Sequence, residues 1–73
     1  MAEMGMLFAY GRRFREKLKK AGAVSEETAK TIEELGLSNR EIRTLRRNVA
    51  IGKVREITDE KGEKRYYVPS SRH

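Results

Sequence analysis

The chain has 73 residues, of which 38% are charged; it contains no cysteine and a single histidine, His73. A chain of this length buries about 60% of its unfolded surface, so we expect one small domain with a thin core and no deep catalytic cleft. This composition excludes disulfides and a histidine-based metal site; we expect no cofactor and no enzyme activity.

The net charge of +6 is unevenly distributed along the sequence. Residues 25–37 carry a net charge of −3, whereas residues 38–55 carry +5. Such a concentrated basic segment indicates a polyanionic partner. The abundance of charged residues, with no glutamine and two asparagines, is typical of thermophile proteins. No apolar run is long enough for a signal peptide or a membrane span, so we expect a cytoplasmic protein without a membrane partner.

The first predicted helix covers about residues 7–21. Leu7, Tyr10, Phe14 and Leu18 recur at separations of three or four and form one apolar stripe, and Gly22 is expected to end the helix. These apolar residues exceed what so small a core needs, which suggests pairing of two copies or, alternatively, a disordered N-terminus. The dimer-interface candidates are Met4, Leu7, Tyr10 and Phe14.

Two further helices are predicted on either side of a very short turn. Ser25 is expected to cap a helix that ends at Gly36. Ser38 with Glu41 three residues later is a capping box, so a third helix is expected from about Asn39 to Ile51, ended by Gly52. Its inward residues are Ile42, Leu45 and Val49.

After the third helix, the stretch "KVREITDEKGEKRYYV" predicts a β-hairpin. Valine, isoleucine, threonine and tyrosine flank the loop "DEKG", whose glycine can take the positive φ of a type I turn with a bulge. A four-residue loop would place Glu56 opposite Arg65. Tyr66 and Tyr67 either pack on the core or stack on unpaired bases.

This order of elements, with "ELGLSNREIRTLRRNVAIGKV" and a closing "RYYV", resembles the winged helix-turn-helix domains of small bacterial and archaeal transcription regulators over about residues 14–68. Ile32 stands where that family usually has alanine. The resemblance implies an α+β fold, a three-helix winged helix-turn-helix with a C-terminal two-stranded β-hairpin wing. We expect a single domain over residues 1–73, with a core at about 7–68 and flexible tails at 1–6 and 69–73.

The resemblance implies double-stranded DNA binding by a transcription regulator that inserts its third helix in the major groove. Arginine can hold guanine through two parallel hydrogen bonds, and the N-terminal end of such a helix meets base edges. The base-reading candidates are Asn39, Arg40, Arg43, Thr44 and Arg47. The phosphate-binding candidates are Ser38, Arg46, Lys53, Lys61 and Lys64.

Other interpretations of the same residues stay open. An arginine stripe is also an ordinary solvated helix face, and the predicted loop from Asp59 to Arg65 has three acids and three bases, so the hairpin could simply cover the core. A winged-helix module for protein–protein contact in a nucleic-acid-processing assembly, or an RNA-binding protein, are the alternative functions.

Overall fold

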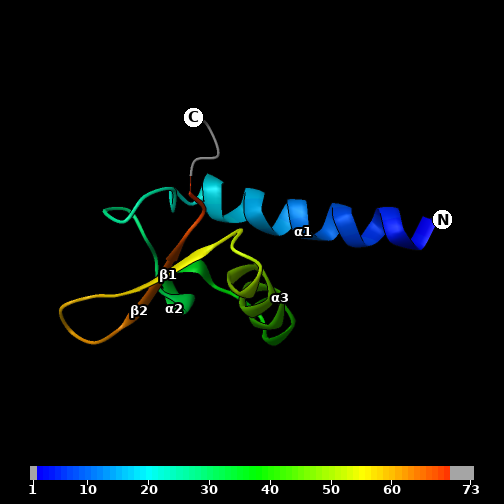
Figure 1. The fold of residues 1–73 in the computed structure, drawn as a ribbon. Helices are drawn as coiled ribbons and strands as arrows, with labels where there is room; N and C mark the ends of the chain where they lie inside the picture. Colours follow the sequence, from blue (N-terminus) through cyan, green and yellow to red (C-terminus); the bar gives the residue numbers. More distant parts are fainter. Residues whose placement is uncertain (1, 70–73) are drawn as a thin grey trace.

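Within residues 2–69, whose backbone the computed structural model describes, the chain forms three helices and one two-stranded antiparallel sheet (Figure 1). Side chains are described from residue 11 to residue 69. The elements are α1 (Ala2–Lys20), α2 (Ile32–Leu35), α3 (Asn39–Ala50), β1 (Arg55–Thr58) and β2 (Lys64–Tyr67). This is the small α+β arrangement that the sequence predicts, with a hairpin after the last helix.

The first helix, α1, packs its C-terminal half on the rest of the fold. Phe14 and Leu18 are 3% and 0% exposed, as the apolar stripe predicts. The helix ends before Gly22, where the Ala23 amide donates to the Leu18 carbonyl at 3.0 Å. In Figure 1 the N-terminal half of α1 extends beyond α3 and the sheet.

The segment between α1 and α2 does not form the helix predicted from Ser25. Ser25 lies in a turn instead, closed by the Thr28 amide, which donates to the Ser25 carbonyl at 3.1 Å. Lys30 is extended and exchanges two backbone hydrogen bonds with Tyr66, at 3.0 and 2.8 Å. A partner so distant in the sequence overrides the local helical pattern, because it satisfies both backbone groups of Lys30.

Consequently α2 is a single turn, and its N-cap is Thr31. The Thr31 hydroxyl accepts from the Glu34 amide at 3.0 Å, and the Glu34 carboxylate accepts from the Thr31 amide at 3.0 Å. Gly36 ends the helix as predicted, with a left-handed φ of 65° that glycine tolerates best. Leu37 then packs against the core.

The third helix, α3, begins with the predicted capping box. The Ser38 hydroxyl accepts from the Glu41 amide at 3.2 Å, and the Glu41 carboxylate accepts from the Ser38 amide at 2.9 Å. The helix ends at Ala50, one residue before the predicted end. On its inner face Leu45 is 1% exposed.

The hairpin register differs by one residue from the predicted one. Glu56 pairs with Tyr66 rather than with Arg65, which lies opposite Ile57. The Tyr66 hydroxyl donates to the Glu56 carboxylate at 2.9 Å, so the acid pairs with a phenol in place of the expected arginine.

The cause of this shift is the loop, which is shorter than the predicted four residues. The Asp59 amide donates to the Glu63 carbonyl at 2.9 Å, which extends the pairing by one residue on each strand. The Gly62 amide donates to the Asp59 carbonyl at 3.0 Å, so the turn holds residues 60–62. Gly62 has φ 84°, the positive value that a type I turn with a bulge requires and that the sequence predicts.

Candidate nucleic-acid interface

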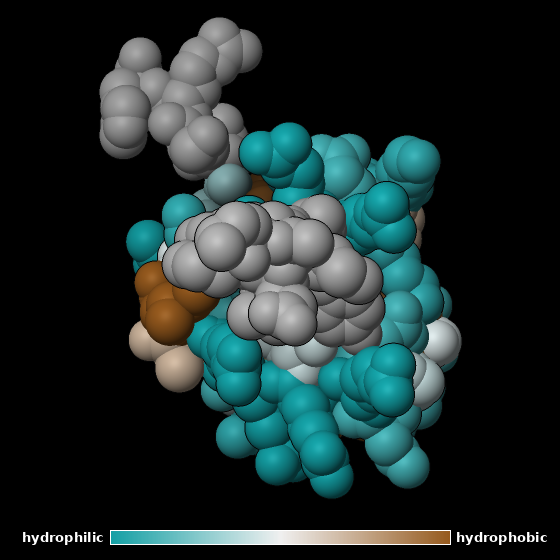
Figure 2. Space-filling view, turned by 90° about the vertical axis from the view of Figure 1, so that its right-hand side faces the viewer, coloured by the Kyte–Doolittle hydropathy of each residue, from teal (hydrophilic) through white to brown (hydrophobic). Residues whose placement is uncertain are grey.

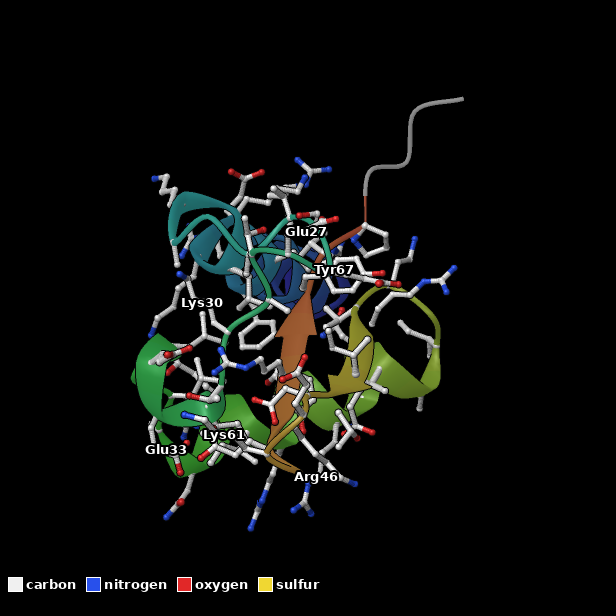
Figure 3. All side chains as sticks on the ribbon, turned by 90° about the vertical axis from the view of Figure 1, so that its left-hand side faces the viewer. Glu27, Lys30, Glu33, Arg46, Lys61 and Tyr67 are labelled. Atoms are coloured by element: carbon white, nitrogen blue, oxygen red, sulfur yellow. The ribbon has the colours of Figure 1, made fainter. Side chains whose placement is uncertain are left out.

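The outer face of α3 carries a row of arginines. At 100° per residue, Arg40, Arg43 and Arg47 project on the side opposite buried Leu45. All three are exposed, as is Asn39 at the start of the helix. Arg46 lies on the side of α3 that faces the hairpin. Figure 3 shows it at the edge of the molecule, with its guanidinium directed outward. Four of the five base-reading candidates therefore lie exposed on one helix.

None of the four α3 arginines has a carboxylate within 4.0 Å among the side chains of residues 11–69. Arg43 and Arg47 are four residues apart, and Arg40 and Arg43 are three apart, so their like charges repel across one turn. Such pairs cost a helix a few tenths of a kcal/mol each. The arrangement therefore does not stabilise the folded chain.

Two predicted polar residues of this region use their hydroxyls inside the protein. Thr44, a base-reading candidate, is half-buried, and its hydroxyl donates to the Arg40 carbonyl at 3.3 Å. Ser38, a phosphate candidate, is exposed, but its hydroxyl already accepts the Glu41 amide. Both hydroxyls therefore bind backbone atoms at α3 and are not free on its outer face.

On its inner side, α3 is attached to α1 through Asn48, which is 3% exposed. The Asn48 side-chain oxygen accepts from the Arg15 guanidinium at 2.9 Å, and its side-chain nitrogen donates to the Thr44 carbonyl at 2.8 Å. Asn48 is not among the residues that the sequence analysis singled out. A polar asparagine within the inward stripe of α3 is the signal that points to a buried hydrogen-bond partner.

A second contact attaches the start of α3 to α1. The Lys17 ammonium lies 3.0 Å from the Glu41 carboxylate. The Ser38 amide first, and Lys17 next, hold the pKa of Glu41 below its ordinary value, because both stabilise the carboxylate. Arg15 and Lys17 therefore both join α1 to α3 through side-chain contacts.

The remaining phosphate candidates differ in their surroundings. Arg46, Lys53 and Lys61 are exposed, and no carboxylate lies within 4.0 Å of them among the described side chains. Lys64 is also exposed, but its ammonium lies 3.9 Å from the Glu56 carboxylate.

In the hairpin, Arg65 is balanced by carboxylates. The Arg65 guanidinium lies 2.8 Å from Asp59, 3.0 Å from Glu34 of α2 and 3.9 Å from Glu63, and it also donates to the Ala29 carbonyl at 3.2 Å. The hydrogen bond to Arg65 holds the pKa of Asp59 below its ordinary value. The pKa of Glu34 is lowered first by the Thr31 amide and further by Arg65. Arg65 therefore connects the hairpin to α2 and contributes no free charge.

The two tyrosines do not provide a stacking surface. Tyr66 and Tyr67 are 7% and 9% exposed and belong to the hydrophobic core. Figure 3 shows Tyr67 well inside the outline of the molecule, surrounded by other side chains. Burial, and secondly the hydrogen bond to Glu56, raises the pKa of Tyr66 to about 12.

The dimer-interface candidates fall into two groups. Phe14 is 3% exposed and packs in the core of its own chain, so it is not an outer contact residue. The side chains of Met4, Leu7 and Tyr10 lie outside the described residues, as do Met1 and residues 70–73 of the predicted tails.

The surface around α1 is mostly hydrophilic. Figure 2, which faces the side where α1 begins and α3 lies, shows predominantly hydrophilic residues and one compact hydrophobic area. Among the described side chains the large exposed hydrophobic residues are Ile51, 61% exposed, and Val24, 47% exposed. None of the helices in the described part of the chain is long and apolar enough to cross a membrane.

Comparison with known proteins identified no related protein. No protein-family model, no curated protein and no solved structure matches the chain.

Proposed function

We propose that this protein binds double-stranded DNA through α3, as a transcription regulator with a winged helix-turn-helix arrangement. In this proposal α3 enters the major groove, and the β1–β2 hairpin takes the position of the wing. An α-helix with its side chains is about 10–12 Å wide, which matches the roughly 12 Å width of the major groove of B-form DNA.

The observation that carries the proposal is the unbalanced charge of α3. Four exposed arginines on one helix lack a carboxylate partner among the described side chains, although acids elsewhere in the fold are paired with Lys17, Lys64 and Arg65. Exposed like charges in one row cost folding energy, so their arrangement is better explained by a polyanionic partner.

The attachment of α3 supports the same function. Sequence reading needs side chains held in a fixed register on the duplex, and a helix that tilts freely cannot provide it. The Arg15–Asn48 and Lys17–Glu41 contacts hold α3 at two positions on its inner side, at 2.9 and 3.0 Å. The outer arginines are therefore carried by a helix that two side-chain contacts attach to α1.

The alternatives draw less support from the structure. RNA binding by base stacking needs exposed aromatic rings, and Tyr66 and Tyr67 are both below 10% exposed. Large exposed apolar patches often mark protein-interaction sites. Among the described side chains the large exposed hydrophobic residues are Ile51 and Val24, and single residues of this kind are ordinary on a protein surface.

The test is fluorescence anisotropy of a labelled random-sequence DNA duplex, titrated at several salt concentrations. The double variant Arg43→Ala/Arg47→Ala is expected to bind at least about tenfold more weakly, because two cations leave the face that meets the duplex. The variant Lys19→Ala/Lys20→Ala removes the same charge from the end of α1 and is the matched control, with a smaller expected loss. Binding that is absent, or that weakens equally in both variants, would refute the role of α3.

Pairing of two copies remains a prediction from the sequence. If Met4, Leu7 and Tyr10 mediate it, sedimentation at micromolar concentration will give twice the monomer mass. Replacing all three by serine will then restore the monomer without unfolding residues 11–69. A dimer would present two α3 helices to successive major grooves about 34 Å apart.

A further inference from the structure

A hollow lies between α3 and the hairpin. Its volume is about 360 Å³, and it is lined by two residues of α3 and three of the hairpin: Arg46, Val49, Glu56, Lys64 and Tyr66. This volume is well above the roughly 30 Å³ that one water molecule occupies, so the hollow has room for a phosphate group. Val49 and Tyr66 provide a partly apolar floor, while the other three side chains are charged.

The charges around this hollow are not equivalent. Arg46 has no carboxylate within 4.0 Å among the described side chains, whereas Lys64 lies 3.9 Å from Glu56. That pair is weak, because the Lys64 and Glu56 side chains are 63% and 37% exposed and water screens them. The other carboxylate oxygen of Glu56 accepts the Tyr66 hydroxyl at 2.9 Å, which keeps the acid in place.

The inference drawn from this hollow rests on the proposed function, because that function determines where the phosphate strands of the duplex run. A helix that fills the major groove has one phosphate strand along each of its flanks. Arg46 lies on the flank of α3 that faces the hairpin, since it shares the hollow with Glu56 and Lys64. The strand on that flank therefore passes over the hollow.

We infer that the hollow between α3 and the hairpin binds one phosphodiester group of this strand, with Arg46 and Lys64 as its ligands and Glu56 as the residue that limits the affinity. When the phosphate is bound, Lys64 turns from the Glu56 carboxylate to the phosphate, while Glu56 keeps its hydrogen bond to Tyr66. The uncompensated carboxylate then faces the phosphate, and the repulsion weakens binding.

The test compares Glu56→Gln with Glu60→Gln in the duplex titration. Both variants remove one negative charge from the hairpin, but Glu60 is an exposed residue of the turn and does not line the hollow. Glutamine at position 56 keeps an oxygen that can accept the Tyr66 hydroxyl. We expect Glu56→Gln to tighten binding about fivefold at low salt and Glu60→Gln less than about twofold, because exposed charges at the tip are screened.

Two further variants test whether the tighter binding of Glu56→Gln depends on Arg46 and Lys64. Lys64→Gln and Arg46→Gln should each lower the salt slope by about 0.9, as expected for one lost phosphate contact. In an Arg46→Gln/Lys64→Gln background, the gain in affinity from Glu56→Gln should fall to that of Glu60→Gln, because the hollow then holds no phosphate for the Glu56 carboxylate to repel. Urea unfolding of each variant verifies that the fold is intact.

The outcomes separate this inference from the proposed function. If the unmodified protein binds duplex through Arg43 and Arg47, but Glu56→Gln and Glu60→Gln give equal gains, the phosphate site is wrong and the role of α3 stands. If duplex binding is absent, the proposed function fails, and this inference fails with it. An equal Glu56→Gln gain on a single-stranded oligonucleotide would overturn the assignment to a duplex strand.

Discussion

The outer face of α3 and the hairpin are both rich in cations, but their charges are used differently. On α3, Arg40, Arg43 and Arg47 project outward without a carboxylate partner among the described side chains. In the hairpin, Arg65 contacts three carboxylates and Lys64 faces Glu56. A count of basic residues therefore does not distinguish the two regions, whereas the row of arginines on one face of α3, unpaired among the described side chains, does.

The two regions also differ in what their charges contribute to stability. Repulsion along α3 lowers the stability of the helix slightly, while the contacts of Arg65 connect β2, the turn and α2. Substitutions of the outer arginines of α3 should therefore change binding with little effect on stability, and substitutions at Arg65 should do the opposite.

Charge reversal should have the largest effect, and it should be confined to α3. Arg43→Glu places a negative charge at the centre of the outer face and is expected to weaken duplex binding about 100-fold at moderate salt. Lys61→Glu makes the same charge change in the hairpin turn, and the expected loss is less than about fivefold. Anisotropy titrations measure both. Equal losses would mean that net charge, rather than the face of α3, determines binding.

The next effect concerns the support behind the arginines. Asn48→Ala leaves the Arg15 guanidinium and the Thr44 carbonyl without their buried partner, so the free energy of unfolding should fall by about 2 kcal/mol in urea titrations. Asn39→Ala changes the same residue type at an exposed position of α3 and should stay within about 0.5 kcal/mol. A small effect of Asn48→Ala would show that α3 does not need this contact.

Acid should weaken the hairpin contacts and leave the arginines charged. The pKa values of Glu34, Glu41 and Asp59 are lowered in the folded chain from ordinary values of 4.5, 4.5 and 3.8. Their stabilisation is present above those ordinary values and is lost as the pH falls through the lowered, folded-state values. Urea unfolding between neutral pH and pH about 3 should show this loss, and the loss should be shallower in Arg65→Met.

An unchanged acid dependence in Arg65→Met would contradict the role assigned to Arg65 in the hairpin. Arg43→Met is the control for this comparison, since it removes one arginine from α3. Its stability should follow the acid dependence of the unmodified protein, because Arg43 has no carboxylate partner among the described side chains.

The smallest effect is expected in alkali, at the bottom of the hollow. The pKa of Tyr66 is raised from 10.0 to about 12, so its contribution to stability is complete below pH about 10 and is lost between pH about 10 and 12. Phenolate absorbance should show a late ionisation step, and Tyr66→Phe should remove it. Late ionisation that persists in Tyr66→Phe would assign it to another tyrosine.

Much of the fold could be predicted because its signals are local. The capping box of Ser38 and Glu41, the glycine stop at Gly36 and the turn glycine Gly62 each act over a few residues, and all are present in the structure. Thr31 and Glu34 form a second capping box with the same local signature, which the interpretation of Ser25 as N-cap obscured.

The errors arose where the decisive partner is distant in the sequence. The extended backbone at Lys30 depends on Tyr66, and the position of Asn48 depends on Arg15, 33 residues away. For the candidate site, helical spacing was enough to place the arginines on one face. Their lack of ion-pair partners depends on where every acid of the fold lies, which no local pattern contains.

The backbone contact between Lys30 and Tyr66 has a consequence for the order of folding. Contacts within α3 and between β1 and β2 join residues close in sequence and can form early, whereas the Lys30 contact must close a loop of 36 residues. Lys30 has no position to pair with until β2 exists, so the segment before α2 docks after the hairpin. The amide of Lys30 then exchanges its hydrogen with solvent when this segment leaves β2, even while the hairpin itself stays closed.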